Sequence, residues 1–203
     1  MHTCYYDGSF ALTLDIVNKS LPAVVDAELF DLKRVSKLWI MVSSGPMPPG
    51  IERLGRIEPL RRLTIMGTTT GGLEGPLPPG FWSFSARSFW LSDMGPQFTG
   101  SLDSDPPGCE YLDRELYLYN LPSFSGDISS LRSCARLHGV AIYNVPLLTG
   151  NAWDILLSWG RPPIDTYLQD CAFSGEVPYA DDDASAMVLA SDPWQQWCRD
   201  APD

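Results

Sequence analysis

Glycines recur along this chain at a nearly constant separation, and that ladder constrains the fold more than any other feature of the sequence. Each stands two residues before an apolar or small residue, often with proline nearby: Gly45, Gly75, Gly100, Gly126, Gly150 and Gly175. Their successive separations are 30, 25, 26, 24 and 25 residues. A fixed period of this length is the sequence signature of a repeat architecture, in which every repeat is one structural unit.

Each unit carries a short strand pattern upstream of its glycine. Apolar residues alternate in Leu12-x-Leu14, Leu38-x-Ile40, Leu63-x-Ile65, Phe89-x-Leu91, Leu116-x-Leu118 and Val140-x-Ile142. This period of two predicts short half-buried strands. The last unit admits two registers, Ile164-x-Thr166 or Thr166-x-Leu168. We expect about seven units, and they must stack because one unit cannot bury its own apolar side chains.

The units resemble the plant-type leucine-rich repeat, whose pattern runs L-x-x-L-x-L…L-x-G-x-I-P. The closest segments are LEGPLP at 73–78 and FSGEVP at 173–178, and the resemblance covers residues 10–178. It implies a repeat solenoid with short parallel β-strands on a concave face and an irregular or short helical convex side. One departure is that the asparagine expected after the strand is displaced, because Asn120 and Asn144 stand one position early.

We interpret residues 1–203 as a single leucine-rich-repeat domain. Residues 1–20 would form the amino-terminal cap and first unit, 21–178 the repeats, and 179–203 a carboxy-terminal cap or tail. Terminal repeats need a cover with a polar outer side. Trp194 and Trp197 are expected to cover the last repeat.

Charge excludes several kinds of partner. The chain has 14 Lys and Arg against 25 Asp and Glu, a net charge of −11, which would repel the phosphates on which nucleic-acid affinity depends. No apolar run is long enough for a transmembrane helix, so membrane insertion is not expected. The resemblance favours a cell-surface or extracellular location, and a cytoplasmic location stays open.

Catalysis finds no support in the sequence. The two histidines, His2 and His138, have no nucleophile or metal partner at a motif spacing, although acid–base and metal chemistry usually require such groups. We therefore expect a non-enzymatic protein without a cofactor or a bound metal.

Two rows of outward-facing residues follow from the strand pattern. The apolar pair of each strand points into the core, so the residue between the pair and the residue after it face outward. The first row, here called the tryptophan row, is Thr13, Trp39, Thr64, Trp90, Tyr117, Ala141 and Tyr167. The second, the tyrosine row, is Asp15, Met41, Met66, Ser92, Tyr119, Tyr143 and, in one register, Gln169.

The large side chains of these rows are the candidate binding residues. They are Trp39, Met41, Met66, Trp90, Tyr117, Tyr119, Tyr143 and Tyr167. Tryptophan, tyrosine and methionine are enriched at protein interfaces, so the rows predict a surface for a protein or peptide, with Lys37, Arg62 and Glu115 as its polar rim. Two other interpretations stay open: the rings only stabilise the sheet through cross-strand pairs, or the assumed register is wrong.

At the level of function, two alternatives accompany the binding module. One is a structural subunit of a larger assembly, and the other is a secreted inhibitor of a hydrolase. The second would be similar in kind to the leucine-rich-repeat proteins that block plant cell-wall hydrolases.

Two features concern covalent chemistry. Cys109 and Cys134 lie 25 residues apart, which is one repeat, so stacking could bring them within disulfide reach, although two buried thiols fit equally well. Asn18 begins an Asn-Lys-Ser triplet, a glycosylation acceptor if the chain is secreted.

Overall fold

The computed structural model describes ten segments of the chain. They are residues 2–6, 10–16, 36–42, 45–47, 51, 60–68, 71–82, 85–102, 109–160 and 165–174. The proposed glycosylation residue Asn18 and the tail from residue 179, with its two tryptophans, lie outside the described residues.

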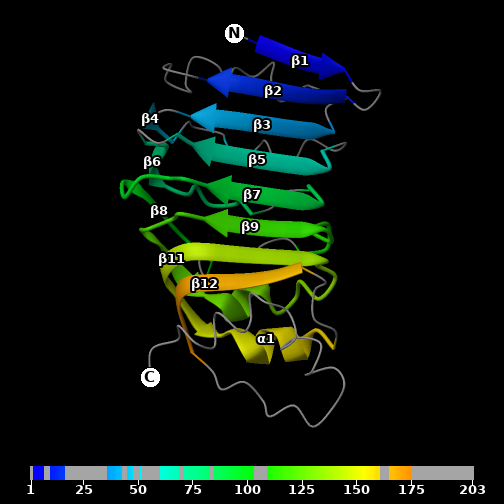
Figure 1. The fold of residues 1–203 in the computed structure, drawn as a ribbon, viewed down its shortest axis with the longest axis vertical. Helices are drawn as coiled ribbons and strands as arrows, with labels where there is room; N and C mark the ends of the chain where they lie inside the picture. Colours follow the sequence, from blue (N-terminus) through cyan, green and yellow to red (C-terminus); the bar gives the residue numbers. More distant parts are fainter. Residues whose placement is uncertain are drawn as a thin grey trace.

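Parallel strands stacked in chain order form one long sheet (Figure 1). In the described segments its parallel strands are β2 (Phe10–Ile16), β3 (Lys37–Val42), β5 (Arg62–Gly67), β7 (Ser88–Ser92), β9 (Glu115–Tyr119), β11 (Gly139–Asn151) and β12 (Asp165–Ser174). At the amino-terminal edge, β1 (His2–Tyr6) pairs antiparallel with β2.

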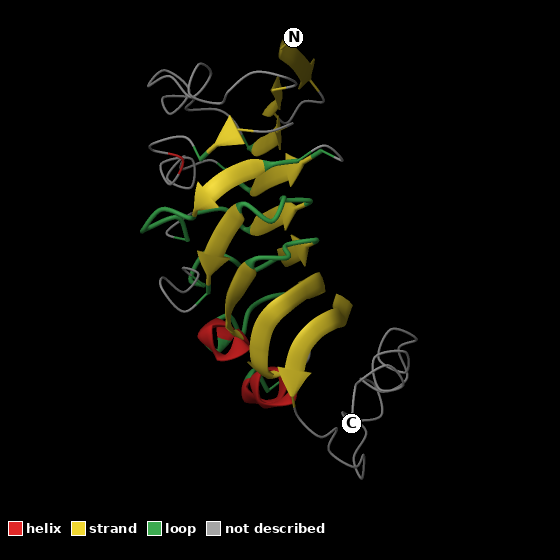
Figure 2. Cartoon of the chain, turned by 90° about the vertical axis from the view of Figure 1, so that its left-hand side faces the viewer, coloured by secondary structure: helices red, strands yellow, loops and turns green. Residues whose placement is uncertain are grey.

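A second row of short parallel strands follows the first. It consists of β4 (Gly45–Pro46), β6 (Leu73–Pro76), β8 (Phe98–Ser101) and β10 (Phe124–Asp127). The later parts of β11 and β12 continue this row. These two long strands therefore bend and belong to both the long sheet and the second row. Figure 2 shows the two rows as separate layers of the stack. The chain is therefore a parallel β-solenoid, as the period predicted.

Helix is scarce in the described segments, and the two helices with described bounds lie in the later turns. A short 3-10 helix (η4, Ile128–Leu131) follows β10, and the α-helix α1 (Ala152–Ser158) follows β11. Each starts at a side-chain cap: Asp127 accepts a hydrogen bond from the Ser129 amide, and Asn151 accepts one from the Asp154 amide. Asparagine and aspartate are favoured at this position because they satisfy an amide that the helix leaves unpaired.

The strand register agrees with the prediction. Thr13, Trp39, Thr64, Trp90, Tyr117, Ala141 and Tyr167 stand opposite one another on successive strands, and the tyrosine row is likewise in register. In the last unit Thr166 pairs with Val140 and Leu168 with Ile142, which selects Thr166-x-Leu168. A displaced register is therefore excluded for these strands.

The apolar pairs fill the space between the two rows of strands. From the long sheet come Leu38, Ile40, Leu63, Ile65, Phe89, Leu91, Leu116, Leu118, Val140 and Ile142, all buried, and from the second row come Leu73, Phe98, Phe124 and Leu148. Leu77 and Phe173 are only partly buried and pack against this core. Trp82, in the connection before β7, lies at the centre of a cluster of rings with Phe89 and Phe124.

The glycine of the repeat is required by the backbone. Gly75, Gly126 and Gly150 have φ angles of 93°, 118° and 103°, in the region that side chains with a Cβ rarely adopt. At Gly150 a Cβ would also lie 2.5 Å from Oδ1 of Asp127 in the preceding turn. At these three positions the ladder of glycines thus marks a backbone conformation that favours glycine, and at Gly150 it also marks a close approach of neighbouring turns.

Candidate functional site

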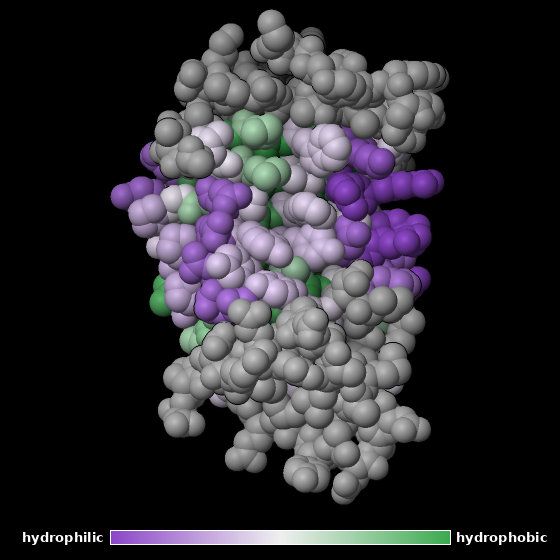
Figure 3. All heavy atoms as spheres, in the orientation of Figure 1, coloured by the Kyte–Doolittle hydropathy of each residue, from purple (hydrophilic) through white to green (hydrophobic). Residues whose placement is uncertain are grey.

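The outward face of the long sheet carries the side chains expected to bind a partner. We call the set Trp39, Met41, Met66, Trp90, Tyr117, Tyr119, Tyr143 and Tyr167 the aromatic stripe. Trp39 and Met41 are 38% and 36% exposed, and the others are partly buried. Figure 3 looks onto this face: weakly polar side chains occupy its middle, and strongly hydrophilic ones flank them on both sides.

Five rings of the aromatic stripe form a continuous chain across β7, β9, β11 and β12. Trp90 and Tyr117 meet edge to face, with ring centroids 4.5 Å apart. The following pairs are Tyr117–Tyr119 at 6.5 Å, Tyr119–Tyr143 at 5.7 Å and Tyr143–Tyr167 at 6.0 Å. Such contacts contribute about 0.5–1.5 kcal/mol each, so they hold the rings in place and stabilise the sheet.

Polar contacts fix the tryptophan at one end of this chain of rings. The Arg62 guanidinium carbon lies 5.2 Å from the centre of the Trp90 ring, and its Nη2 is 2.6 Å from Glu115 Oε2. The indole Nε1 of Trp90 donates to the same carboxylate oxygen, at 3.4 Å. Two of the expected rim residues, Arg62 and Glu115, therefore bind each other and orient Trp90.

Two small residues of the tryptophan row are not exposed, contrary to the prediction. Thr64 is 2% exposed and Ala141 is 5% exposed. In the register Thr64 stands between Trp39 and Trp90, and Ala141 between Tyr117 and Tyr167. A short side chain between two large rings on neighbouring strands is covered by them.

Two tyrosine hydroxyls of the stripe, those of Tyr119 and Tyr167, are protonated at neutral pH. Burial raises the pKa of Tyr119, and the neighbouring Tyr143 adds to the effect. Burial also raises the pKa of Tyr167, whose hydroxyl donates to Gln169 Oε1. Tyr119 and Tyr167 can thus present neutral hydroxyls to a ligand.

Four polar residues, each one position after a member of the tyrosine row, line one side of the stripe. Asp93, Asn120, Asn144 and Asp170, here called the Asp/Asn ladder, have φ angles of 59°, 50°, 52° and 54°. Asn120 Nδ2 donates to Asp93 Oδ1 at 2.6 Å, and Asn144 Nδ2 donates to Asn120 Oδ1 at 3.1 Å. Asn120 and Asn144, which stand one position early for the family pattern, therefore connect neighbouring turns. Sequence reasoning missed the two aspartates, although Asp93 directly follows β7 and Asp170 lies within β12 at the level of Asn144.

We predict that Asn120→Ala lowers the free energy of unfolding by about 2 kcal/mol, because it loses two hydrogen bonds and places a Cβ without a polar side chain at positive φ. Asn120→Gly removes the same hydrogen bonds without the backbone cost and should lose clearly less. Urea unfolding of both variants measures the difference. Equal losses would mean that the positive φ is not a source of strain here.

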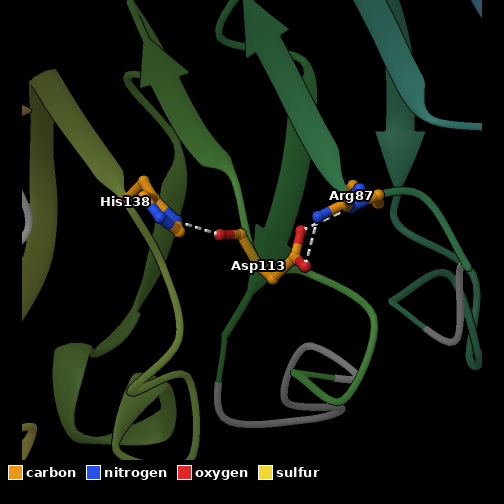
Figure 4. Close-up of polar contacts among 3 residues, drawn as sticks. All are labelled: Arg87, Asp113 and His138. Atoms are coloured by element: carbon orange, nitrogen blue, oxygen red, sulfur yellow. Dashed lines mark hydrogen bonds and ion pairs between the residues drawn. The ribbon is translucent and has the colours of Figure 1, made fainter.

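The opposite side of the stripe, where the strands begin, holds a bidentate ion pair (Figure 4). Arg87 donates from Nε and Nη2 to the two carboxylate oxygens of Asp113, both at 2.7 Å. His138 Nδ1 lies 2.7 Å from the Asp113 carbonyl oxygen. The hydrogen bonds from Arg87 lower the pKa of Asp113, and Arg136 and Arg114 lower it further by their charge. Three successive turns are thus joined, a link that sequence reasoning did not find.

A covalent link joins two neighbouring turns through the connections that precede β9 and β11. Cys109 and Cys134 form a disulfide, with their Cα atoms 4.7 Å apart, the first of the two alternatives left open for this pair. Cys171 is a free thiol, and burial raises its pKa to about 12. Since the thiolate is the attacking species in disulfide exchange, Cys171 is a poor competitor for the bridge at neutral pH.

Fold and site together define the class of protein as a parallel β-solenoid with an ordered aromatic face on its long sheet. No family model matches the chain, and no curated protein and no solved structure matches it. In the described segments no helix is long and apolar enough to cross a membrane. Among the same residues, no three His, Cys, Asp or Glu side chains are grouped to hold a metal ion.

Proposed function

We propose that this protein is a non-enzymatic recognition module that binds a protein or peptide on the aromatic stripe. The observation that carries the proposal is the continuous chain of rings from Trp90 to Tyr167 on the outward face of the long sheet. Trp39 and Met41, further along the same face, are exposed. Rings already held in place lose little conformational freedom on binding, which favours affinity.

We further propose that the module is of the leucine-rich-repeat class with plant-type repeats. In support, the glycines of the L-x-G-x-I-P pattern lie in the second row of strands, as Gly75 does in β6 and Gly126 in β10. The preceding apolar residues Leu73 and Phe124 are buried beneath that row. Repeat length and the alternation in the long sheet agree with the same class.

The test uses a partner captured from the native source and then purified. Trp90→Ala combined with Tyr117→Ala should weaken its binding at least about 30-fold, because truncating a hot-spot residue costs about 2 kcal/mol or more. Titration calorimetry measures the affinity. Tyr111→Ala is the matched control, because this ring is 54% exposed and lies outside the strands of both rows; we expect it to bind normally.

One result would contradict the proposal: a double variant with an unchanged circular-dichroism spectrum and undiminished affinity. The rings would then serve only to stabilise the sheet through their cross-strand contacts. That outcome would appear as a lowered unfolding free energy without a change in binding.

A further inference from the structure

Arginines are stacked at the edge of the long sheet where its strands begin. Arg61, Arg87 and Arg114 occupy equivalent positions in successive turns: the Arg114 amide donates to the Arg87 carbonyl, and the Ser88 amide donates to the Arg61 carbonyl, both at 2.9 Å. Strands lie about 4.8 Å apart, so the three backbone positions repeat at that spacing. Figure 3 shows strongly hydrophilic side chains gathered along this edge.

Neighbouring cations widen the stack into what we call the basic edge: Lys37, Arg61, Arg62, Arg87, Arg114 and Arg136. In the described segments two of them form ion pairs, Arg62 with Glu115 and Arg87 with Asp113. The other four are in neither pair, and Arg61, Arg114 and Arg136 are exposed. Three arginines, Arg87, Arg114 and Arg136, act on the single carboxylate of Asp113. Among the described residues of the edge, positive charges therefore outnumber negative ones.

This clustering is unfavourable for the isolated fold. The whole chain has only 14 Lys and Arg and a net charge of −11, yet arginines stand on adjacent turns, where like charges repel. The repulsion between these arginines is compensated if a ligand bound on the aromatic stripe supplies the missing negative charge. Across the stripe, the Asp/Asn ladder carries Asp93 and Asp170 and offers no such attraction.

We propose that the occupant of the aromatic stripe is an acidic polypeptide segment whose Asp and Glu carboxylates lie along the basic edge. This inference rests on the proposed function and specifies the chemistry of its partner. From β3 to β9 the edge spans three strand spacings, about 15 Å, which an extended segment of about five residues covers. Arginine binds carboxylates through paired donors, and the rings provide apolar contact beside them.

The experiment is a selection of random dodecapeptides displayed on phage, carried out on the intact chain and on two variants. Arg114→Glu changes the basic edge. Arg132→Glu makes the same change in net charge at another exposed arginine, the C-cap of η4. We expect Asp and Glu to be enriched in peptides selected by the wild type and by Arg132→Glu, and the enrichment to be lost with Arg114→Glu. In fluorescence anisotropy, Arg114→Glu should raise the Kd of a selected peptide about tenfold, and salt should weaken the wild-type complex.

Three results would overturn the inference. The first is a set of selected peptides that are neutral or basic. The second is an equal loss of binding in the two arginine variants, which would show that only the net charge of the chain matters. A concentration-dependent dimer lost in Arg114→Glu would place a second copy of the chain on this face instead. Neutral peptides that depend on Trp90 but not on Arg114 would leave the proposed function intact and remove only its acidic partner.

Discussion

Trp82→Ala should lower the free energy of unfolding by about 4 kcal/mol, within the range found when a buried aromatic ring is removed from a core. Trp82 is 1% exposed. Its ring meets Phe81, Phe89 and Phe124 edge to face, at centroid distances of 5.6, 5.3 and 6.1 Å. Because these rings come from a connection, a strand of the long sheet and a strand of the second row, the cavity would loosen both rows at once. Urea unfolding followed by far-ultraviolet circular dichroism measures the loss.

Trp39→Ala is the matched control, since it removes the same side chain from a site that is 38% exposed. Surface substitutions usually change stability by no more than about 0.5 kcal/mol, so Trp39→Ala should unfold close to the wild-type midpoint. A similar loss in both variants would show that Trp82 is not the centre of the core. In a solenoid each turn contacts mainly its neighbours, so a broadened transition for Trp82→Ala would also locate the damage to the turns around β7.

Sequence alone was sufficient for the parallel strands of the long sheet and, except in the last unit, for their register, for a physical reason. Leu63-x-Ile65 and its equivalents can bury their side chains only if every strand keeps the same register, because a shift of one residue would expose the whole set. The identity of the outward rows follows directly from that condition. Trp82 was not predicted, because the connections between strands have no alternating pattern that could mark a buried residue.

The polar contacts of the site could not be derived in the same way. The pair Arg87–Asp113 joins residues 26 positions apart, and its geometry depends on side-chain conformations that no pattern records. Thr64 was expected to face water, but its burial depends on the rings of Trp39 and Trp90 on either side. The helix starts could have been predicted, because Asp127 and Asn151 are capping residues. They were not recognised because each directly follows a repeat glycine.

Replacing Cys109 and Cys134 together by alanine should lower the free energy of unfolding by about 3 kcal/mol, the entropy that a closed loop of this length removes from the unfolded chain. The two residues are separated by 25 positions, so the bridge joins corresponding points of neighbouring turns. Both side chains are buried, 6% and 0% exposed, and alanine leaves no polar group unsatisfied there. Urea unfolding with and without dithiothreitol measures the contribution.

Reduction provides the internal control. Dithiothreitol should lower the wild-type midpoint towards that of the double-alanine variant, while the variant itself should not respond. Cys171→Ala should lose stability in dithiothreitol as the wild type does, because its thiol takes no part in the bridge. A wild-type midpoint that is the same with and without reductant, together with alkylation of both cysteines in the unfolded chain, would favour two buried thiols. The stability of neighbouring turns would then depend on packing alone, and the double-alanine variant would lose only what its small cavities cost.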